Sequence, residues 1–345
     1  MKLYRKEWSR RELEARIGRI EQIGGVRRMI LTEGKEAGVE EIQVRTGAGL
    51  AYSVLPSRGL DIGLTEYRGV PLSWLSPNGE VHPAFFDERD FGWLRTAVGG
   101  LLMTCGLTQV GSPGNDAGEE LGLHGRTHHT PARHVCSKGF WEGDEYTTLI
   151  EGVVEETSIF GWNLRLTRQI SSRLGKNQIH IRDIVENAGF EPAPHMLLYH
   201  FNFGFPLLDP QTQFSFPKAD VIPREPQLPI EGLGDWQQPQ PGYQERVYYY
   251  EHLAIGADGM AAVSVRNPHF PSTNGPLTVR LAWEARHLPV LVQWKMPGEG
   301  TYVLGVEPAN CHVEGRTAER ACGTLVLLAP GQAMEYNLDL SLIEE

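Results

Sequence analysis

Residues 194–204 read Pro-His-Met-Leu-Leu-Tyr-His-Phe-Asn-Phe-Gly, and this apolar and aromatic run is typical of an inner β-strand. Because side chains alternate along a strand, His200 and Asn202 share one face. The aromatic residues of the run share the opposite face: Tyr199, Phe201 and Phe203. A buried histidine and asparagine need hydrogen-bond partners, which other core groups or a bound substrate would supply.

Short runs of the same kind recur on both sides of this stretch, separated by Gly, Pro, Asn and Asp. They cover residues 41–45, 51–55, 61–64, 146–154, 163–170, 178–185, 277–283, 290–294, 323–328 and 334–340. Many short strands with turn residues between them predict an all-β fold, a sandwich or barrel of antiparallel sheets. The chain lacks a regular alternation of strands and helices, which disfavours a doubly wound nucleotide-binding fold.

The first segment has a different pattern, typical of a helix. Ser9 and Glu12 have the spacing of a capping box, and Leu13, Ile17 and Ile20 recur at helical intervals before a Gly-Gly pair ends the segment. We therefore expect a short N-terminal helix.

Two loop-rich regions, residues 76–92 and 217–242, carry aromatic residues among their Pro, Gly, Asn and Gln. Such loops in a compact β protein often form functional rims, and these aromatics argue against flexible linkers. We expect a single domain over residues 1–345 with a helical extension over residues 1–22. The aromatic residues expected from their position to line a pocket are Trp74, Phe86, Trp93 and Trp236.

Composition excludes several classes of partner. The 345 residues are 41% hydrophobic and 22% charged, which is ordinary for a globular protein with a large core. The formal net charge of -11 opposes binding to nucleic acid and to anionic lipid, both of which need a basic face. A small anionic substrate stays compatible with this charge, because a local arginine can override it.

Membrane insertion and export are not expected. No run of 18 apolar residues occurs, and the charged first residues lack the apolar centre of a signal peptide. The four cysteines are far apart and form no CxxC pair, which favours free thiols in a reducing cytoplasm.

Three further motifs contain residues suited to acid/base chemistry. His124 lies in Gly-Leu-His-Gly-Arg, where glycines permit a tight turn and close approach of a ligand, so this histidine could donate a hydrogen bond to a sugar hydroxyl. Glu307 ends an apolar strand, and apolar surroundings raise a carboxyl pKa and suit a general base. Arg58 could bind sugar hydroxyls or a carboxylate, with Asp61 orienting it, although a structural Arg–Asp pair explains this motif equally well.

Cofactor and metal motifs are weak or absent. Glycine-rich phosphate loops and the Ser-nucleophile elbow do not occur, so we expect no cofactor. Four histidines lie close together in the sequence, which permits a cupin-like metal site as an alternative, but no carboxylate stands at ligand spacing among them. They are His124, His128, His129 and His134. We expect no metal.

Taken together, these segments resemble the aldose 1-epimerase (galactose mutarotase-like) superfamily, and most closely its divergent bacterial branch. The resemblance extends over nearly the whole chain. The segments that carry it are residues 55–62, 99–107, 123–126, 199–204 and 305–308.

The resemblance implies a β-supersandwich with a concave face that holds a sugar, and an enzyme that interconverts sugar anomers. It matches His200 to the general acid, Glu307 to the general base and His124 to a sugar-binding residue. Asn202 is a further candidate for substrate binding, although it follows His200 at a shorter spacing than in the family's pattern.

This chain departs from the family pattern at Arg126, where galactose mutarotases usually have glycine. The added charge makes an acidic or phosphorylated sugar plausible, and Arg58 could contribute to the same charge. The mid-chain aspartate that some family members use on the substrate is not identified by the pattern, and Asp220 and Asp235 are candidates by region only.

Two alternatives remain at this stage. A carbohydrate-binding or sensing protein could use the same scaffold without catalysis, since fold does not fix function. The second alternative is a different sugar enzyme, such as a lyase, a hydrolase or a metal-dependent isomerase. A glycosidase usually needs two carboxylates, and the sequence offers only one convincing candidate.

Overall fold

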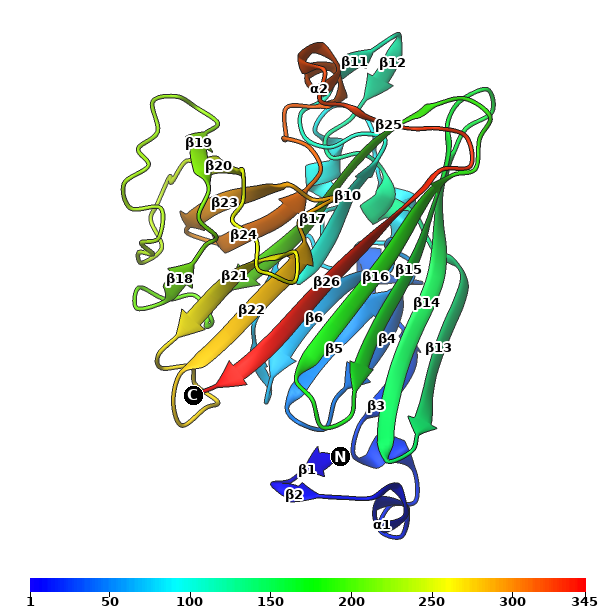
Figure 1. Cartoon of the computed structure of the whole chain (residues 1–345), viewed down its shortest axis with the longest axis vertical. Coiled ribbons are helices and arrows are strands. Elements are labelled where there is room, and N and C mark those ends of the chain that lie inside the picture. Colours follow the sequence, from blue (N-terminus) through cyan, green and yellow to red (C-terminus); the bar gives the residue numbers. More distant parts are fainter.

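The computed structural model describes residues 1–345 as two large antiparallel β-sheets packed face to face (Figure 1). The first sheet has twelve strands. Ten form a continuous order: β19 (Asp220–Pro223), β20 (Arg246–Glu251), β23 (Val290–Gly298), β24 (Thr301–Ala309), β17 (Ala193–Gly204), β10 (Leu102–Leu107), β6 (Asp61–Tyr67), β5 (Leu50–Leu55), β4 (Glu40–Arg45) and β3 (Gly25–Ile30). Two short strands are added, β25 (Val326–Leu328) beside β17 and β7 (Val70–Pro71) beside β6.

The second sheet has eight strands. Their order is β13 (Arg133–Glu142), β14 (Glu145–Thr157), β15 (Asn163–Arg173), β16 (Gln178–Asn187), β26 (Ala333–Glu344), β22 (Leu277–Glu284), β21 (Met260–Asn267) and β18 (Gln213–Ser215). Three pairs of short strands form separate ribbons: β1 (Lys2–Leu3) with β2 (Lys6–Glu7), β8 (Trp74–Leu75) with β9 (Gly99–Gly100), and β11 (Gly114–Asp116) with β12 (Glu119–Leu121). The predicted all-β architecture is confirmed.

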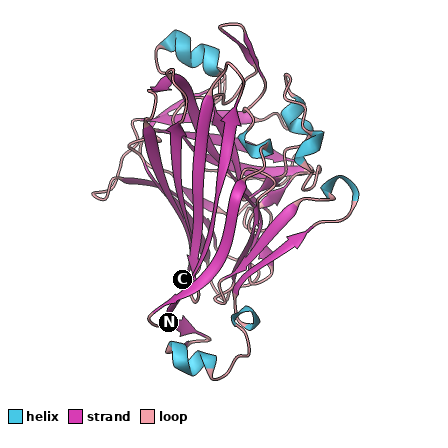
Figure 2. Cartoon of the chain, turned by 90° about the vertical axis from the view of Figure 1, so that its right-hand side faces the viewer, coloured by secondary structure: helices cyan, strands magenta, loops and turns pink.

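Helices are few and short, and none forms a layer over a sheet (Figure 2). The two α-helices are α1 (Arg10–Glu14) and α2 (Arg316–Cys322), and the 3-10 helices are η1 (Ile20–Gln22), η2 (Gly34–Glu36), η3 (Pro83–Phe85), η4 (Gly92–Arg95) and η5 (Thr127–His129). No helix is long and apolar enough to cross a membrane.

The predicted N-terminal helix is present, although it is shorter than the periodicity indicated. Ser9 accepts a hydrogen bond from the backbone of Glu12 and the Glu12 carboxylate accepts one from the backbone of Ser9, so the capping box forms. The α-helix ends at Glu14, and the apolar residues beyond it pack with Leu13 against the end of the second sheet at Tyr146. The expectation of one domain over residues 1–345 stays a prediction.

The main hydrophobic core lies between the two large sheets and draws on both of them. β17 is buried along its whole length because its two faces pack against different cores. Tyr199, Phe201 and Phe203 point into the main core, as the alternation predicted. The opposite face of β17 contributes Met196 and Leu198 to a second, smaller core on the outer side of the first sheet.

This second core forms the floor of a pocket. It combines side chains of β10, β17, β20, β23 and β24 with Trp93 from η4, so the loop before β9 covers part of the outer face of the sheet. The architecture thus leaves one buried strand, β17, with a face directed away from the main core and toward a site.

Candidate active site

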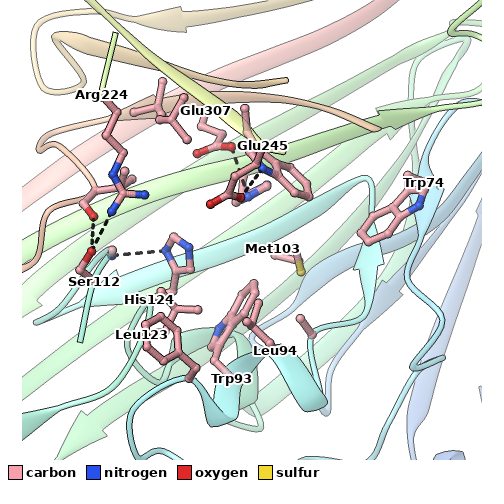
Figure 3. A pocket seen from close by; sticks show the side chains of 18 residues that line it. Trp74, Trp93, Leu94, Met103, Ser112, Leu123, His124, Arg224, Glu245 and Glu307 are labelled. Carbon is pink, nitrogen blue, oxygen red and sulfur yellow. Dashed lines mark hydrogen bonds and ion pairs between the residues drawn. The ribbon is translucent and has the colours of Figure 1, made fainter. Parts of the chain in front are cut away.

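The pocket on the outer face of the first sheet encloses about 210 Å³ and is lined by 18 residues, 11 of them hydrophobic (Figure 3). Water occupies about 30 Å³ per molecule in the liquid, so the space equals about seven waters and suits one small polar molecule. Trp74, Trp93 and Trp294 supply much of the apolar wall. Aromatic walls with a few convergent polar groups are the usual composition of a small-molecule site.

His200 and Glu307 meet at the floor of this pocket. Their strands, β17 and β24, pair antiparallel with Phe201 opposite Val306, and this register places His200 opposite Glu307. His200 Nε2 lies 3.2 Å from Glu307 Oε1. Both side chains are almost fully buried, with exposed fractions of 8% and 3%.

Burial sets the protonation of this pair. Loss of solvent disfavours both charged forms, so it lowers the pKa of His200 to about 4 and raises the pKa of Glu307 well above its ordinary value. The nearby carboxylate of Glu245 raises the pKa of Glu307 further. Near neutral pH His200 is therefore neutral, and burial favours the protonated form of Glu307 more than in an ordinary carboxyl group. The resemblance matches His200 to a general acid, and desolvation keeps this histidine neutral until a proton is transferred to it.

Hydrogen bonding at the pair is incomplete. The 3.2 Å approach of His200 Nε2 to Glu307 Oε1 does not have hydrogen-bond geometry, so Glu307 Oε1, like His200 Nδ1, is buried without a hydrogen-bond partner within the protein. Buried polar atoms without partners are rare in folded proteins and costly to leave in that state. A bound molecule with hydroxyl groups would relieve part of this cost.

His124 lies in the pocket wall on a turn with a constrained backbone. Its φ of +57° is in the left-handed region, and its backbone N–H donates to the carbonyl of Gly111 at 2.9 Å. The Nδ1 atom accepts a hydrogen bond from the backbone N–H of Gly111 at 3.3 Å. Burial lowers the pKa of His124 to about 3, so the neutral ring carries its proton on Nε2 and can donate it to a ligand.

Two aromatic residues hold these groups in place. The Trp93 ring lies 4.9 Å from the His124 ring. Trp294 packs edge-on against His200 at 5.5 Å, and its Nε1 donates to Glu245 Oε2 at 2.8 Å. Trp294 therefore links the acid/base pair to the second carboxylate of the pocket.

Three of the expected substrate-binding residues do not line the pocket: Arg58, Asn202 and Arg126. Arg58 is fully buried below it and donates to the backbone carbonyls of Val81 and Thr96, which is a structural role. Asn202 is also fully buried, and it donates to the backbone carbonyls of Gly100 and His200. Full burial leaves neither side chain any surface that a ligand could reach.

Arg126 points to a different part of the surface, where it pairs with Glu88 at 2.7 Å. It lies outside the set of lining residues, although it directly follows the His124 turn. Asp220 and Asp235 also lie outside this set. Of the expected aromatics, Trp74 and Trp93 line the pocket, whereas Phe86 stacks on His129 and Trp236 belongs to the main core.

The histidine cluster of the sequence does not converge on one point. His128 Nδ1 lies 2.7 Å from Asp61, and His129 Nε2 lies 2.8 Å from the Thr96 hydroxyl. His134 is exposed on β13. No group of three His, Cys, Asp or Glu side chains is arranged to hold a metal ion.

Five polar or aromatic lining residues were not singled out from the sequence: Phe91, Ser112, Arg224, Glu245 and Trp294. Arg224 belongs to the loop-rich region 217–242 and Glu245 follows it closely, and that region was expected to form a functional rim. No local motif distinguishes these two residues from other charged residues in the loops. Trp294 was assigned to a strand, but the sequence does not show which face of the sheet it occupies.

The architecture defines the chain as a member of the galactose mutarotase-like fold class, and solved structures share it. A Klebsiella pneumoniae protein provisionally named aldose 1-epimerase matches with a TM-score of 0.84 and 24% identity, over 93% of this chain and 83% of its own. A galactose mutarotase-like protein from Clostridium acetobutylicum matches with a TM-score of 0.62 and 14% identity, over 94% and 100%. A second protein provisionally named aldose 1-epimerase, from Escherichia coli K12, matches with a TM-score of 0.56 and 18% identity, over 86% and 97%.

By sequence, residues 36–342 match the family described as Domain of unknown function (DUF4432), and the chain belongs to this family. No curated protein matches it in sequence. The predicted resemblance to the aldose 1-epimerase superfamily is thus confirmed at the level of fold, in a divergent branch.

Proposed function

We propose that this protein is an enzyme of the aldose 1-epimerase type, which interconverts the α and β anomers of a monosaccharide by opening and closing its ring. The observation that carries the proposal is the contact between His200 and Glu307, 3.2 Å apart at the floor of the pocket. Ring opening requires an acid and a base that share one proton, because the anomeric hydroxyl loses a proton while the ring oxygen gains one. The names of the structural relatives support a sugar as ligand.

The reaction uses the ionised form of the pair. When a sugar binds, its hydroxyl groups hydrogen-bond to Glu307 and favour the carboxylate, so the proton moves to His200 across their contact. Glu307 then removes the proton of the anomeric hydroxyl. The electrons of that O–H bond form the C1 carbonyl, the bond from C1 to the ring oxygen breaks, and His200 protonates the ring oxygen.

Rotation about the C1–C2 bond presents the other face of the carbonyl, and the reverse proton transfers close the ring. His124 donates a hydrogen bond through Nε2 and orients the sugar, while the aromatic wall packs against its C–H face. Each partner of an acid/base pair contributes about 10²- to 10⁴-fold, which is sufficient for a reaction that already proceeds in water.

The test is NMR exchange between α and β anomers, measured over a panel of neutral, acidic and phosphorylated monosaccharides. The wild-type protein should accelerate exchange of at least one sugar, and Glu307→Gln should lower that rate by about 10²- to 10⁴-fold while binding is retained. Glu284→Gln is the matched control, since Glu284 lies on β22 of the second sheet, and it should keep the wild-type rate. Binding without acceleration of any sugar would instead identify a non-catalytic sugar-binding protein.

A further inference from the structure

Arg224 is the only lysine or arginine among the residues that line the pocket. It follows β19, and its backbone N–H donates to the carbonyl of Val247 on β20 at 2.9 Å, which fixes where the side chain begins. The side chain is 27% exposed, so it reaches the cavity without projecting into bulk solvent. Figure 3 shows it beyond His124, at the opposite end of the pocket from Trp74.

One edge of the Arg224 guanidinium is held by the protein. Nε donates to Glu314 Oε1 at 3.1 Å, and Nη2 donates to the Ser112 hydroxyl oxygen at 3.1 Å. Glu314 is itself fixed, because the Tyr249 hydroxyl donates to the same oxygen at 2.6 Å. The guanidinium is thus oriented before any ligand binds, which reduces the entropy lost on binding.

The other edge of the guanidinium is free. A guanidinium has five N–H donors, and neither hydrogen of Nη1 nor the second hydrogen of Nη2 has a protein partner. These donors form the end-on fork that matches the two oxygens of a carboxylate. The neighbouring Ser112 and His124 are also pocket-lining, so the fork adjoins the space that a sugar would fill.

The two ends of the pocket differ in the charge of their side chains. Glu245 places a second carboxyl group beside Glu307, and Glu307 becomes a carboxylate when it acts as the base, so a negative group on the ligand would be disfavoured at this end of the pocket. Arg224 offers the one position where a negative group is favoured. Its charge is already shared with Glu314, so it can compensate a single negative charge better than the double charge of a phosphate monoester.

We propose, on the basis of the proposed function, that the pocket selects a monosaccharide carrying a carboxylate, and that Arg224 binds this carboxylate with its free edge. Arg224 is then the residue that determines specificity, while His200 and Glu307 perform the proton transfers. The alternative is that Arg224 and Glu314 form only a structural ion pair at the rim, in which case the charge of the sugar would have no effect on binding.

Binding and anomer exchange should be measured for D-glucuronate, D-galacturonate, D-glucose, D-galactose and D-glucose 6-phosphate. A uronate should bind best to the wild-type protein. Arg224→Gln should raise its Kd and KM by about 10- to 100-fold, with kcat little changed and the neutral sugars unaffected. Arg224→Lys keeps the charge without the fork, so it should also weaken uronate binding.

Arg133→Gln is the control, because Arg133 forms a surface ion pair with Glu155 on the second sheet. Thermal unfolding of each variant verifies that it is folded. Equal affinity for neutral and acidic sugars, tighter binding of the phosphate ester, or equal effects of Arg224→Gln on all sugars would overturn the inference. Binding by calorimetry needs no turnover. Arg224-dependent uronate binding without anomer exchange would therefore sink the proposed reaction and leave the inference intact.

Discussion

At the scale of single residues, the site depends on two groups whose charged forms are both disfavoured by burial. His200 and Glu307 lie in contact, and the pKa of the first is lowered while that of the second is raised. A neutral pair with one shared proton costs less to bury than an ion pair. The pair can therefore still donate one proton and accept another. The hydroxyl groups of a substrate would provide the hydrogen bonds that the buried pair lacks.

This arrangement predicts the pH dependence of the reaction. As the pH falls through about 4, His200 takes up a second proton, the pair loses its base, and kcat/KM should decrease about tenfold per pH unit. As the pH rises, kcat/KM should fall only above the ordinary pKa range of a carboxyl group, where Glu307 loses the proton that the pair shares.

The measurement is kcat/KM for anomer exchange from pH 3.5 to 9, corrected for uncatalysed exchange, with circular dichroism at each pH to verify folding. The rate should be level around pH 6.5, where an ordinary histidine titrates. An acid limb centred there would show that His200 is solvated and would contradict the neutral pair.

The sequence singled out three residues that line the pocket, but not the whole lining. His124, His200 and Glu307 carry local signals, either a glycine-flanked turn or an apolar strand, and all three line the pocket. Arg58 also lies in a turn motif, but its side chain is fully buried. A turn motif does not show toward which side of a sheet its arginine points. Arg224 came from a loop, and the position of a loop depends on the rest of the fold.

At the scale of elements, the site depends on the pairing of β17 with β24. Antiparallel register sets His200 opposite Glu307, and a slip by one residue would turn one of them toward the main core. Gly305, two residues before Glu307, points to the same face of β24. A Cβ there would lie 2.8 Å from Trp294 Cβ and would overlap Glu307 Oε1. Glycine is required here to leave space for the carboxylate.

Gly305→Ala should therefore displace Glu307 and lower kcat for anomer exchange by about 100-fold, because small misplacements of a catalytic group are costly. Overpacking should also reduce stability by about 1–3 kcal/mol, measured by urea unfolding. Gly234→Ala is the matched control, since a Cβ at Gly234 meets nothing within 4 Å. Wild-type turnover by Gly305→Ala would show that the position of Glu307 is not critical.

The strands that could be predicted from the sequence pattern are those with one face, or both faces, buried. Residues 194–204 lie within β17, and each of the ten further stretches assigned from pattern is a strand or overlaps one. Among the longer strands, β3, β10, β13, β20 and β21 were not assigned. β13 is an edge strand with mixed polar and apolar residues, and β20 is a short tyrosine-rich run directly after a loop region. Their places are set by pairing with neighbouring strands, which local pattern does not encode.

At the scale of the whole molecule, the two sheets share one core, and this leaves the outer face of the first sheet available for a site. Loops before β9 and after β19 cover part of that face and supply Trp93 and Arg224, whereas His200 and Glu307 come from strands β17 and β24. Solved structures with the same fold and low identity indicate that the scaffold tolerates wide changes in sequence.

The central claim is that His200 and Glu307 act as one acid/base unit on a sugar, and a double-mutant cycle tests it most directly. Anomer exchange by NMR should be measured for wild type, His200→Asn, Glu307→Gln and the double variant, with the best sugar of the panel. Each single variant should lose about 10²- to 10⁴-fold, and the double variant should lose hardly more than the worse single variant. Losses that multiply in the double variant, or a single variant with wild-type turnover, would contradict the account.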